Sequence, residues 1–146
     1  MPFSLIFNIK DKCSDGGCKV NKKNIKTIFK PDDGFLDEEL QNTLFPPSYK
    51  ICDCIIVCNN DNIIIVEILC GKLTYSEFKE KSKQLENCHK VVAHKGLEDK
   101  VKKIILHYKR LENSKCNPQF REKLINPKIC GINLELLKDA TISIGC

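Results

Sequence analysis

The sequence contains no segment long and apolar enough to cross a bilayer. Its longest aliphatic runs, residues 55 to 57 and 63 to 66, are three and four residues long, whereas a transmembrane helix needs about 20. The first residues also lack the charged region and the full apolar region of a secretory signal peptide. We therefore expect an intracellular, cytoplasmic protein without a membrane partner.

Tryptophan is absent, methionine occurs once, and the chain of 146 residues has only seven glycines and six prolines. Hydrophobic residues make up 42% and charged residues 29%, which excludes a disordered chain, a collagen and a simple coiled coil. Aromatic residues are few, at 7%, which argues against a platform that stacks the bases of a single strand. The length fits one hydrophobic core, so we expect residues 1 to 146 to form a single domain.

Cysteine, by contrast, is abundant, with ten residues. No two of them have the C-x-x-C spacing that most zinc and redox motifs use. Several lie in apolar runs, where a free cysteine behaves as a small hydrophobic residue, so we expect most of them to be buried thiols. The alternatives are one or two disulfides, or a metal or iron–sulfur site built from distant cysteines.

Lysine and arginine outnumber aspartate and glutamate by 24 to 19, a net charge of +5. This excess permits nucleic-acid binding without requiring it. Basic residues crowd positions 79 to 128, and we expect nucleic-acid contacts within this part of the chain, at Lys100, Lys102, Lys103, Lys109 and Arg110. The alternative is an ordinary solvated, lysine-rich face.

Two β-branched runs in the centre of the chain predict a β-hairpin. Residues 51 to 58 and 63 to 70 flank the turn sequence Asn-Asn-Asp-Asn, and both runs are apolar on both faces, as in a sheet that is covered on each side. A helix at residues 75 to 94 follows. Thr74 and Glu77 have the spacing of a capping box, and Gly96 is suited to the C-terminal cap.

The remaining elements are predicted from weaker patterns. Leucines at every fourth position predict a helix at residues 35 to 45, and residues 24 to 29 predict a short element. Residues 100 to 109 fit a helix or a strand, and we favour a strand because the sheet needs more than a hairpin. The C-terminal part predicts short helices at residues 119 to 125 and 133 to 138. Edge strands at residues 127 to 130 and 141 to 144 would flank the second of these helices.

Two carboxylates in the predicted hairpin are unusual for their surroundings. Asp53 lies near the start of the first strand and Glu67 within the second. A charged carboxylate in an apolar run is costly unless it is paired, bound to metal or at a strand end. Two of them on adjacent strands suit one divalent cation, which would activate water and polarise a phosphoryl oxygen. The alternatives are a strand cap for Asp53 and an ion pair for Glu67.

This pattern resembles the PD-(D/E)XK nuclease superfamily, which has the restriction-endonuclease-like fold. The residues on which the resemblance rests are Cys52-Asp53-Cys54-Ile55-Ile56-Val57, then Ile65-Val66-Glu67-Ile68-Leu69, and Gln84-Leu85 on the following helix. Gln84 matches a glutamine common in Holliday-junction resolvases and RecB-like nucleases. The resemblance covers about residues 35 to 109 and implies an α/β fold with a mixed sheet flanked by helices. It also implies a nuclease that uses Mg²⁺ or Mn²⁺, with Asp53 and Glu67 as metal ligands and Glu39 or Glu38 as a further one.

The sequence departs from the family at one position. The family has a lysine two residues after the glutamate, where this chain has Leu69. Lys72, just past the strand and next to the flexible Gly71, is the first candidate to replace it, Lys81 on the helix is the second, and Lys83 is a further one. Without a replacement, the chain would be an inactive nuclease-fold module that binds nucleic acid or a protein partner, and a homodimer is left open. A cysteine-based metal-binding module is a third hypothesis.

The nuclease hypothesis makes a geometric prediction. Directly opposed residues in a hairpin share one face, so Asp53 faces Glu67 only if the numbers of paired residues sum to an even number. This requires an odd-length loop or a bulge at residues 59 to 62, where asparagine tolerates left-handed backbone. Carboxylates on opposite faces of the sheet would exclude the metal site.

Overall fold

The computed structural model of the chain describes residues 9–10, 13–15, 18–31, 42–45, 50–113, 117–138 and 141–146. Within these ranges the main sheet has seven strands in the order β1-β4-β5-β6-β7-β9-β8. Its strands are β1 (Ile9–Lys10), β4 (Ile25–Phe29), β5 (Cys54–Cys58), β6 (Ile63–Leu73), β7 (Val101–Leu111), β8 (Lys128–Ile129) and β9 (Ile132–Lys138). Neighbours from β1 to β6 are antiparallel, β6, β7 and β9 are parallel, and β8 pairs antiparallel with β9. The predicted α/β class with a mixed sheet is therefore confirmed.

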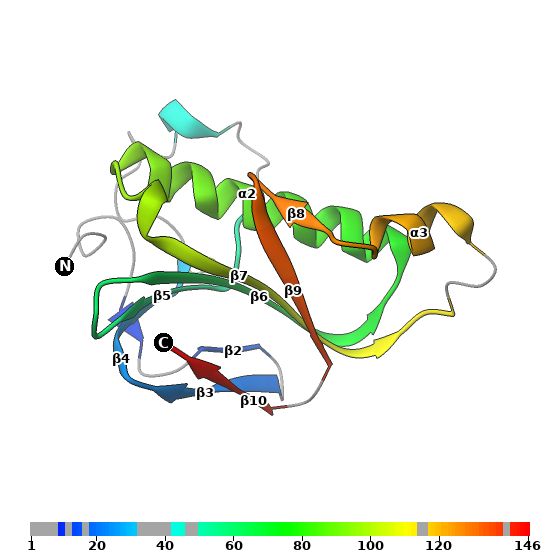
Figure 1. The fold of residues 1–146 in the computed structure, drawn as a ribbon, viewed down its shortest axis with the longest axis horizontal. Helices are drawn as coiled ribbons and strands as arrows, with labels where there is room; N and C mark the ends of the chain where they lie inside the picture. Colours follow the sequence, from blue (N-terminus) through cyan, green and yellow to red (C-terminus); the bar gives the residue numbers. More distant parts are fainter. Residues whose placement is uncertain are drawn as a thin grey trace.

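A second, smaller sheet lies against the opposite side of the main sheet from helix α2 (Tyr75–His94) (Figure 1). It consists of β2 (Cys13–Asp15), β3 (Cys18–Lys23) and β10 (Thr141–Gly145) in the order β10-β3-β2. β10 pairs parallel with β3, although the two strands come from opposite ends of the chain. Across the described ranges, no helix combines the length and the apolar character needed to cross a membrane.

The β5–β6 hairpin has the register that the carboxylate pair requires. Cys54 pairs with Val66 and Val57 with Ile63, so the numbers of paired residues sum to 120, an even number. Cys58 donates its backbone N–H to the Asn62 carbonyl at 2.8 Å, which leaves three residues in the loop. Asp61 has the left-handed φ of 69° that such loops place before a bulge. The prediction of an odd-length loop is confirmed.

Helix α2 begins and ends as the sequence predicted. The Thr74 hydroxyl accepts a hydrogen bond from the Glu77 N–H at 3.1 Å, which satisfies one of the free donors of the first turn. At the other end Gly96 has a φ of 71°, and Leu97 N–H donates to the Val92 carbonyl at 3.1 Å, as in a Schellman cap. The helix connects β6 to its parallel neighbour β7.

The main sheet separates two hydrophobic clusters. Alternate residues of β6, Ile63 and Ile65, face α2, and Ile64 and Val66 face the small sheet. All of these side chains are buried, which explains why the runs are apolar at every position. Glu67 continues the alternation and points to the side of α2.

Two of the predicted elements differ from the structure or lie outside it. The helix predicted at residues 133 to 138 is wrong, because this segment is strand β9, whose alternating Ile132, Leu134 and Leu136 pack against the helix-side cluster. Its period of two matches a strand better than a helix. Of the helix predicted at residues 35 to 45, residues 35 to 41 lie outside the described residues, and residues 42 to 44 are helical.

For the other elements predicted from weaker patterns, the type of element is confirmed. The strand favoured at residues 100 to 109 is β7 (Val101–Leu111), which follows a short 3₁₀ turn, η2 (Glu98–Lys100). The short helix is α3 (Pro118–Lys123), with Asn117 as its N-cap and proline in the first turn, where its missing N–H costs nothing. β8 and β10 are the two predicted short strands, although β10 belongs to the small sheet.

Most described cysteines are disulfide-bonded, so the expectation of buried thiols is wrong. Three complete bridges are present, Cys13–Cys54, Cys52–Cys88 and Cys58–Cys146, and Cys70 is also disulfide-bonded. Bridges of this number point to an oxidising environment, such as the outside of the cell. The expectation of a cytoplasmic, intracellular location is therefore contradicted. These bridges also leave none of the bonded cysteines free for the alternative of a cysteine metal site.

Candidate carboxylate site

Asp53 and Glu67 are directly opposed at the helix side of the sheet. Extending the hairpin register by one pair beyond Cys54 and Val66 brings residue 53 opposite residue 67. Asp53 is 7% exposed and Glu67 is 2% exposed. The Asp53 Oδ2 atom accepts a hydrogen bond from the Ile68 N–H at 2.7 Å, which holds its carboxyl group against strand β6.

Burial and the neighbouring Asp53 change the protonation of Glu67. Burial, followed by the hydrogen bond and the negative charge of Asp53, raises the pKa of Glu67 to about 10. The positive charge of Lys81 acts in the opposite direction. At neutral pH Glu67 therefore carries a proton in the metal-free protein, because two negative charges in contact in a buried site repel each other.

Helix α2 adds a cation and an amide to this pair. Lys81 Nζ lies 4.0 Å from Glu67 Oε2, and the Lys81 side chain is 18% exposed. Gln84, one turn further along α2, is buried. Glu67 Oε2 and Gln84 Oε1 are both buried oxygens without a hydrogen-bond partner within the described residues. Such orphaned oxygens are costly unless a ligand or ion satisfies them.

The segment before β5 is fastened to α2 beside the carboxylates. Cys52, the neighbour of Asp53, is bonded to Cys88 on α2. Asn87 donates its side-chain amide to the Lys50 carbonyl at 2.6 Å, and Lys50 Nζ lies 2.8 Å from Glu80 Oε1. The sequence analysis did not identify these tethers, because two cysteines 36 positions apart carry no pairing signal.

The other predicted members of the site are placed elsewhere or lie outside the description. Leu69, two residues after Glu67, packs against the helix-side cluster. Lys72 is exposed, and no ion pair joins it to Glu67 within the described part of the chain. Lys83 is exposed and pairs with Glu86 at 3.2 Å. Glu38 and Glu39 lie outside the described residues.

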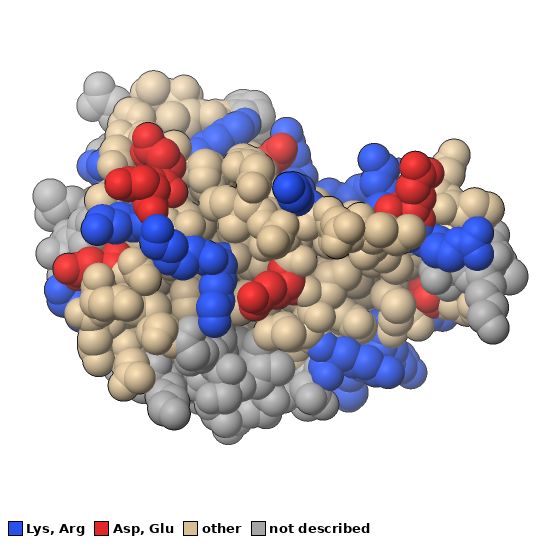
Figure 2. All heavy atoms as spheres, viewed as in Figure 1, with Lys and Arg blue, Asp and Glu red and all other residues tan. Residues whose placement is uncertain are grey.

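The five basic residues predicted to contact nucleic acid do not form one patch. Lys100, Lys102 and Lys103 lie at the start of β7, and Lys109 and Arg110 lie near its end. Because a strand rises about 3.3 Å per residue, Lys102 and Lys109 are roughly 23 Å apart. On the face drawn in Figure 2, lysines and arginines form separate groups with acidic residues between them. The nucleic-acid contacts at these residues stay a prediction.

The donor atoms of the site suit a hard divalent cation in type, though not in number. Asp53, Glu67 and Gln84 offer oxygen atoms only, which Mg²⁺ and Mn²⁺ prefer. Within the described ranges, however, no group of three or more histidine, cysteine or acidic side chains is placed to hold a metal. A cation at this pair would keep most of its water ligands.

Comparisons of the chain with protein-family models, with curated proteins and with solved structures found no match.

Proposed function

We propose that this chain is a metal-dependent nuclease with a restriction-endonuclease-like fold, in which Asp53 and Glu67 bind one Mg²⁺ or Mn²⁺ ion. The observation that carries the proposal is the direct opposition of these two carboxylates beside Lys81 on α2. A strand that begins after Asp53, a strand that contains Glu67, a capped helix with Gln84 and a parallel strand follow one another. This is the order that the resemblance to PD-(D/E)XK nucleases requires.

Lys81 supplies the cation that the sequence lacks at Leu69. Its Nζ atom is near Glu67 Oε2, and a positive charge there favours the ionised form of Glu67 and would attract a phosphate group. Gln84 can orient a water molecule or a ligand through its unpaired amide oxygen. The bound ion, when present, lowers the pKa of a water molecule and polarises the phosphoryl oxygen.

Cleavage assays with purified protein test this proposal. Single-stranded, duplex and branched DNA and RNA are incubated with millimolar Mg²⁺ or Mn²⁺, because a single carboxylate pair binds Mg²⁺ weakly. Glu67→Gln should abolish cleavage and leave nucleic-acid affinity within a few-fold of wild type. Cleavage that persists in Glu67→Gln would exclude this site.

Lys81→Ala and Lys72→Ala form a matched pair that identifies the replacement lysine. Loss of one electrostatic stabiliser lowers a rate by about 10²-fold or more, so we expect this loss for Lys81→Ala and little change for Lys72→Ala. The reverse result would assign the role to Lys72, which the sequence analysis favoured from its position after Gly71.

The second candidate is a nuclease-fold module without catalytic activity. Two observations favour it, namely the apolar Leu69 in the lysine position and the 2% exposure of Glu67. A scissile phosphate could reach Glu67 only if covering groups moved. If wild type and Leu69→Lys are both inert on every substrate while nucleic acid or a protein partner still binds, this second function is correct.

A further inference from the structure

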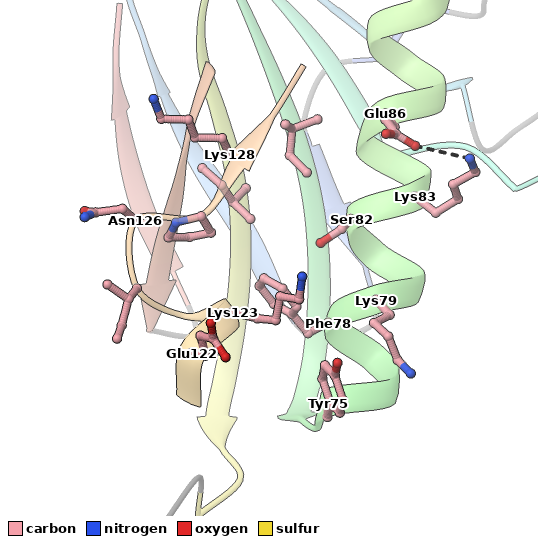
Figure 3. Close-up of a pocket in the computed structure, with 14 residues that line it drawn as sticks. Tyr75, Phe78, Lys79, Ser82, Lys83, Glu86, Glu122, Lys123, Asn126 and Lys128 are labelled. Carbon is pink, nitrogen blue, oxygen red and sulfur yellow. Dashed lines mark ion pairs between the residues drawn. The ribbon is translucent and has the colours of Figure 1, made fainter. Parts of the chain in front are cut away.

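A cavity separates α2 from α3 and the β8–β9 hairpin (Figure 3). Its volume of about 770 Å³ lies within the range of roughly 300–1,000 Å³ that is typical of ligand pockets. Phe120 of α3, fully buried, stacks on Tyr75 at 5.6 Å and contacts Phe78 at 5.9 Å between ring centres. This packing fixes α3 against α2, so the cavity is preformed.

The rim of the cavity is basic. Four lysines line it against two glutamates, a net charge of +2. One of the glutamates, Glu86, is already paired with Lys83 at 3.2 Å. Lys79 lies 4.5 Å above the ring of Tyr75, and Lys123 and Lys128 line the opposite side.

Inside the cavity, a hydroxyl group and an amine are directed to the same space. Figure 3 shows the oxygen of Ser82 on α2 and the amine of Lys123 on α3 both turned into the gap between the two helices. Ser82 Oγ is buried and has no hydrogen-bond partner within the described residues. A hydroxyl donor beside an ammonium group is a suitable pair of contacts for one phosphate group.

This cavity is distinct from the carboxylate site. Ser82 and Gln84 are two residues apart on α2, which places their side chains about 200° apart around the helix axis. Lys81 and Gln84 belong to the flank of α2 near Asp53, and the cavity lies on the other flank.

We propose that this cavity binds the phosphate backbone of a single-stranded nucleic acid, with one phosphate held between Ser82 and Lys123. The proposal rests on the proposed function in that the substrate is a nucleic acid. The remaining lysines would contact the adjacent phosphates. Apolar wall residues, among them Ile125, which is 67% exposed, would cover a base or a sugar.

The dimensions and the charge favour this occupant. A cavity of about 770 Å³ is large enough for a short stretch of a single strand but too small to enclose a duplex. An acidic peptide would also be attracted by the lysines, but a lone carboxylate fills fewer of the donors than a phosphate does.

Fluorescence anisotropy with a labelled oligothymidylate, in EDTA so that no cleavage occurs, tests the proposal. For the full chain, each neutralised phosphate of a single strand contributes about −0.7 to the slope of log affinity against log salt. The double variant Lys123→Ala/Lys128→Ala should therefore reduce the magnitude of this slope by about 1.4 and lower affinity on the order of tenfold at low salt. Ser82→Ala should lower affinity a few-fold without changing the slope.

Lys95→Ala, an exposed lysine just after α2 and outside the cavity, is the matched control and should bind like wild type. Unchanged binding by the double variant, with a native circular dichroism spectrum, would overturn the proposal. So would equal affinity for duplex, or binding of an acidic peptide instead of the oligonucleotide. Because Glu67→Gln is tested for cleavage and the cavity variants for binding without metal, either proposal can fail while the other stands.

Discussion

Among the described residues, Glu67 is the one whose acid–base behaviour the fold alters most. Because burial and Asp53 raise its pKa to about 10, the folded protein binds a proton that the unfolded chain releases near pH 4.5. The folded state therefore binds more protons than the unfolded state between these two values, and stability falls as pH rises through this window.

This leads to a prediction for Glu67→Gln, which resembles the neutral acid in shape and carries no charge. In EDTA, wild type should lose stability from about pH 5 towards pH 10, and the variant should lose less. The difference in free energy of unfolding between variant and wild type should therefore increase with pH. Urea denaturation at several pH values measures it, and parallel curves for the two proteins would contradict the raised pKa.

The sequence indicated part of this site. The free-energy cost of a carboxylate in an apolar strand identified Asp53 and Glu67, and the hypothesis that they face each other predicted the odd-length loop of the hairpin, which the register confirms. Lys81 was the second choice there, because its distance from Glu67 depends on where α2 crosses the sheet. The basic cavity depends on α3 and β8 packing beside α2, which no local pattern shows.

At the scale of the element, helix α2 contributes Lys81 and Gln84 to the carboxylate site, and its start is fixed by its first turn. We predict that Thr74→Ala lowers the free energy of unfolding by about 1 kcal/mol, because it removes the cap acceptor of the Glu77 N–H. Urea denaturation measures the loss. Ser76→Ala, an exposed hydroxyl in the same turn, is the control and should change stability by less than about 0.5 kcal/mol.

The elements were predicted well where a local signal was complete. The capping box, the hydrophobic spacing and Gly96 together defined α2, and β-branched runs around an Asn-rich turn defined the hairpin. The helix predicted at residues 133 to 138 was wrong because the alternation of Ile132, Leu134 and Leu136 is short and Leu137 interrupts it. The pairing of β9 with β7 stabilises the strand, and that pairing is a long-range property.

At the scale of the whole molecule, disulfides join three layers, namely helix α2, the main sheet and the small sheet. Closing a loop of 36 residues between Cys52 and Cys88 removes unfolded-state entropy equivalent to about 4 kcal/mol. We predict that Cys52→Ser/Cys88→Ser lowers the free energy of unfolding by roughly 2–4 kcal/mol, measured by urea denaturation without reductant. In the nuclease assay the same variant should also lose activity, since Asp53 is no longer fastened to α2.

Cys130→Ser is the control for this prediction. Cys130 is the free, exposed cysteine among the described residues, and its replacement should leave stability within about 0.5 kcal/mol of wild type. A double variant as stable as this control would mean that the hydrogen bond and the ion pair from Lys50 hold the segment without the bridge.

Strand β5 is the point at which all three layers are covalently joined. Cys54 and Cys58 connect it to the small sheet through Cys13 and Cys146, and Cys52 beside it is bonded to α2. A protease that cuts the chain beside the exposed Asn113 therefore produces two fragments that stay together, since the bonded Cys58 and Cys146 lie on opposite sides of the cut. In an oxidising medium rich in proteases, the nicked chain would retain its shape until a reductant releases the pieces.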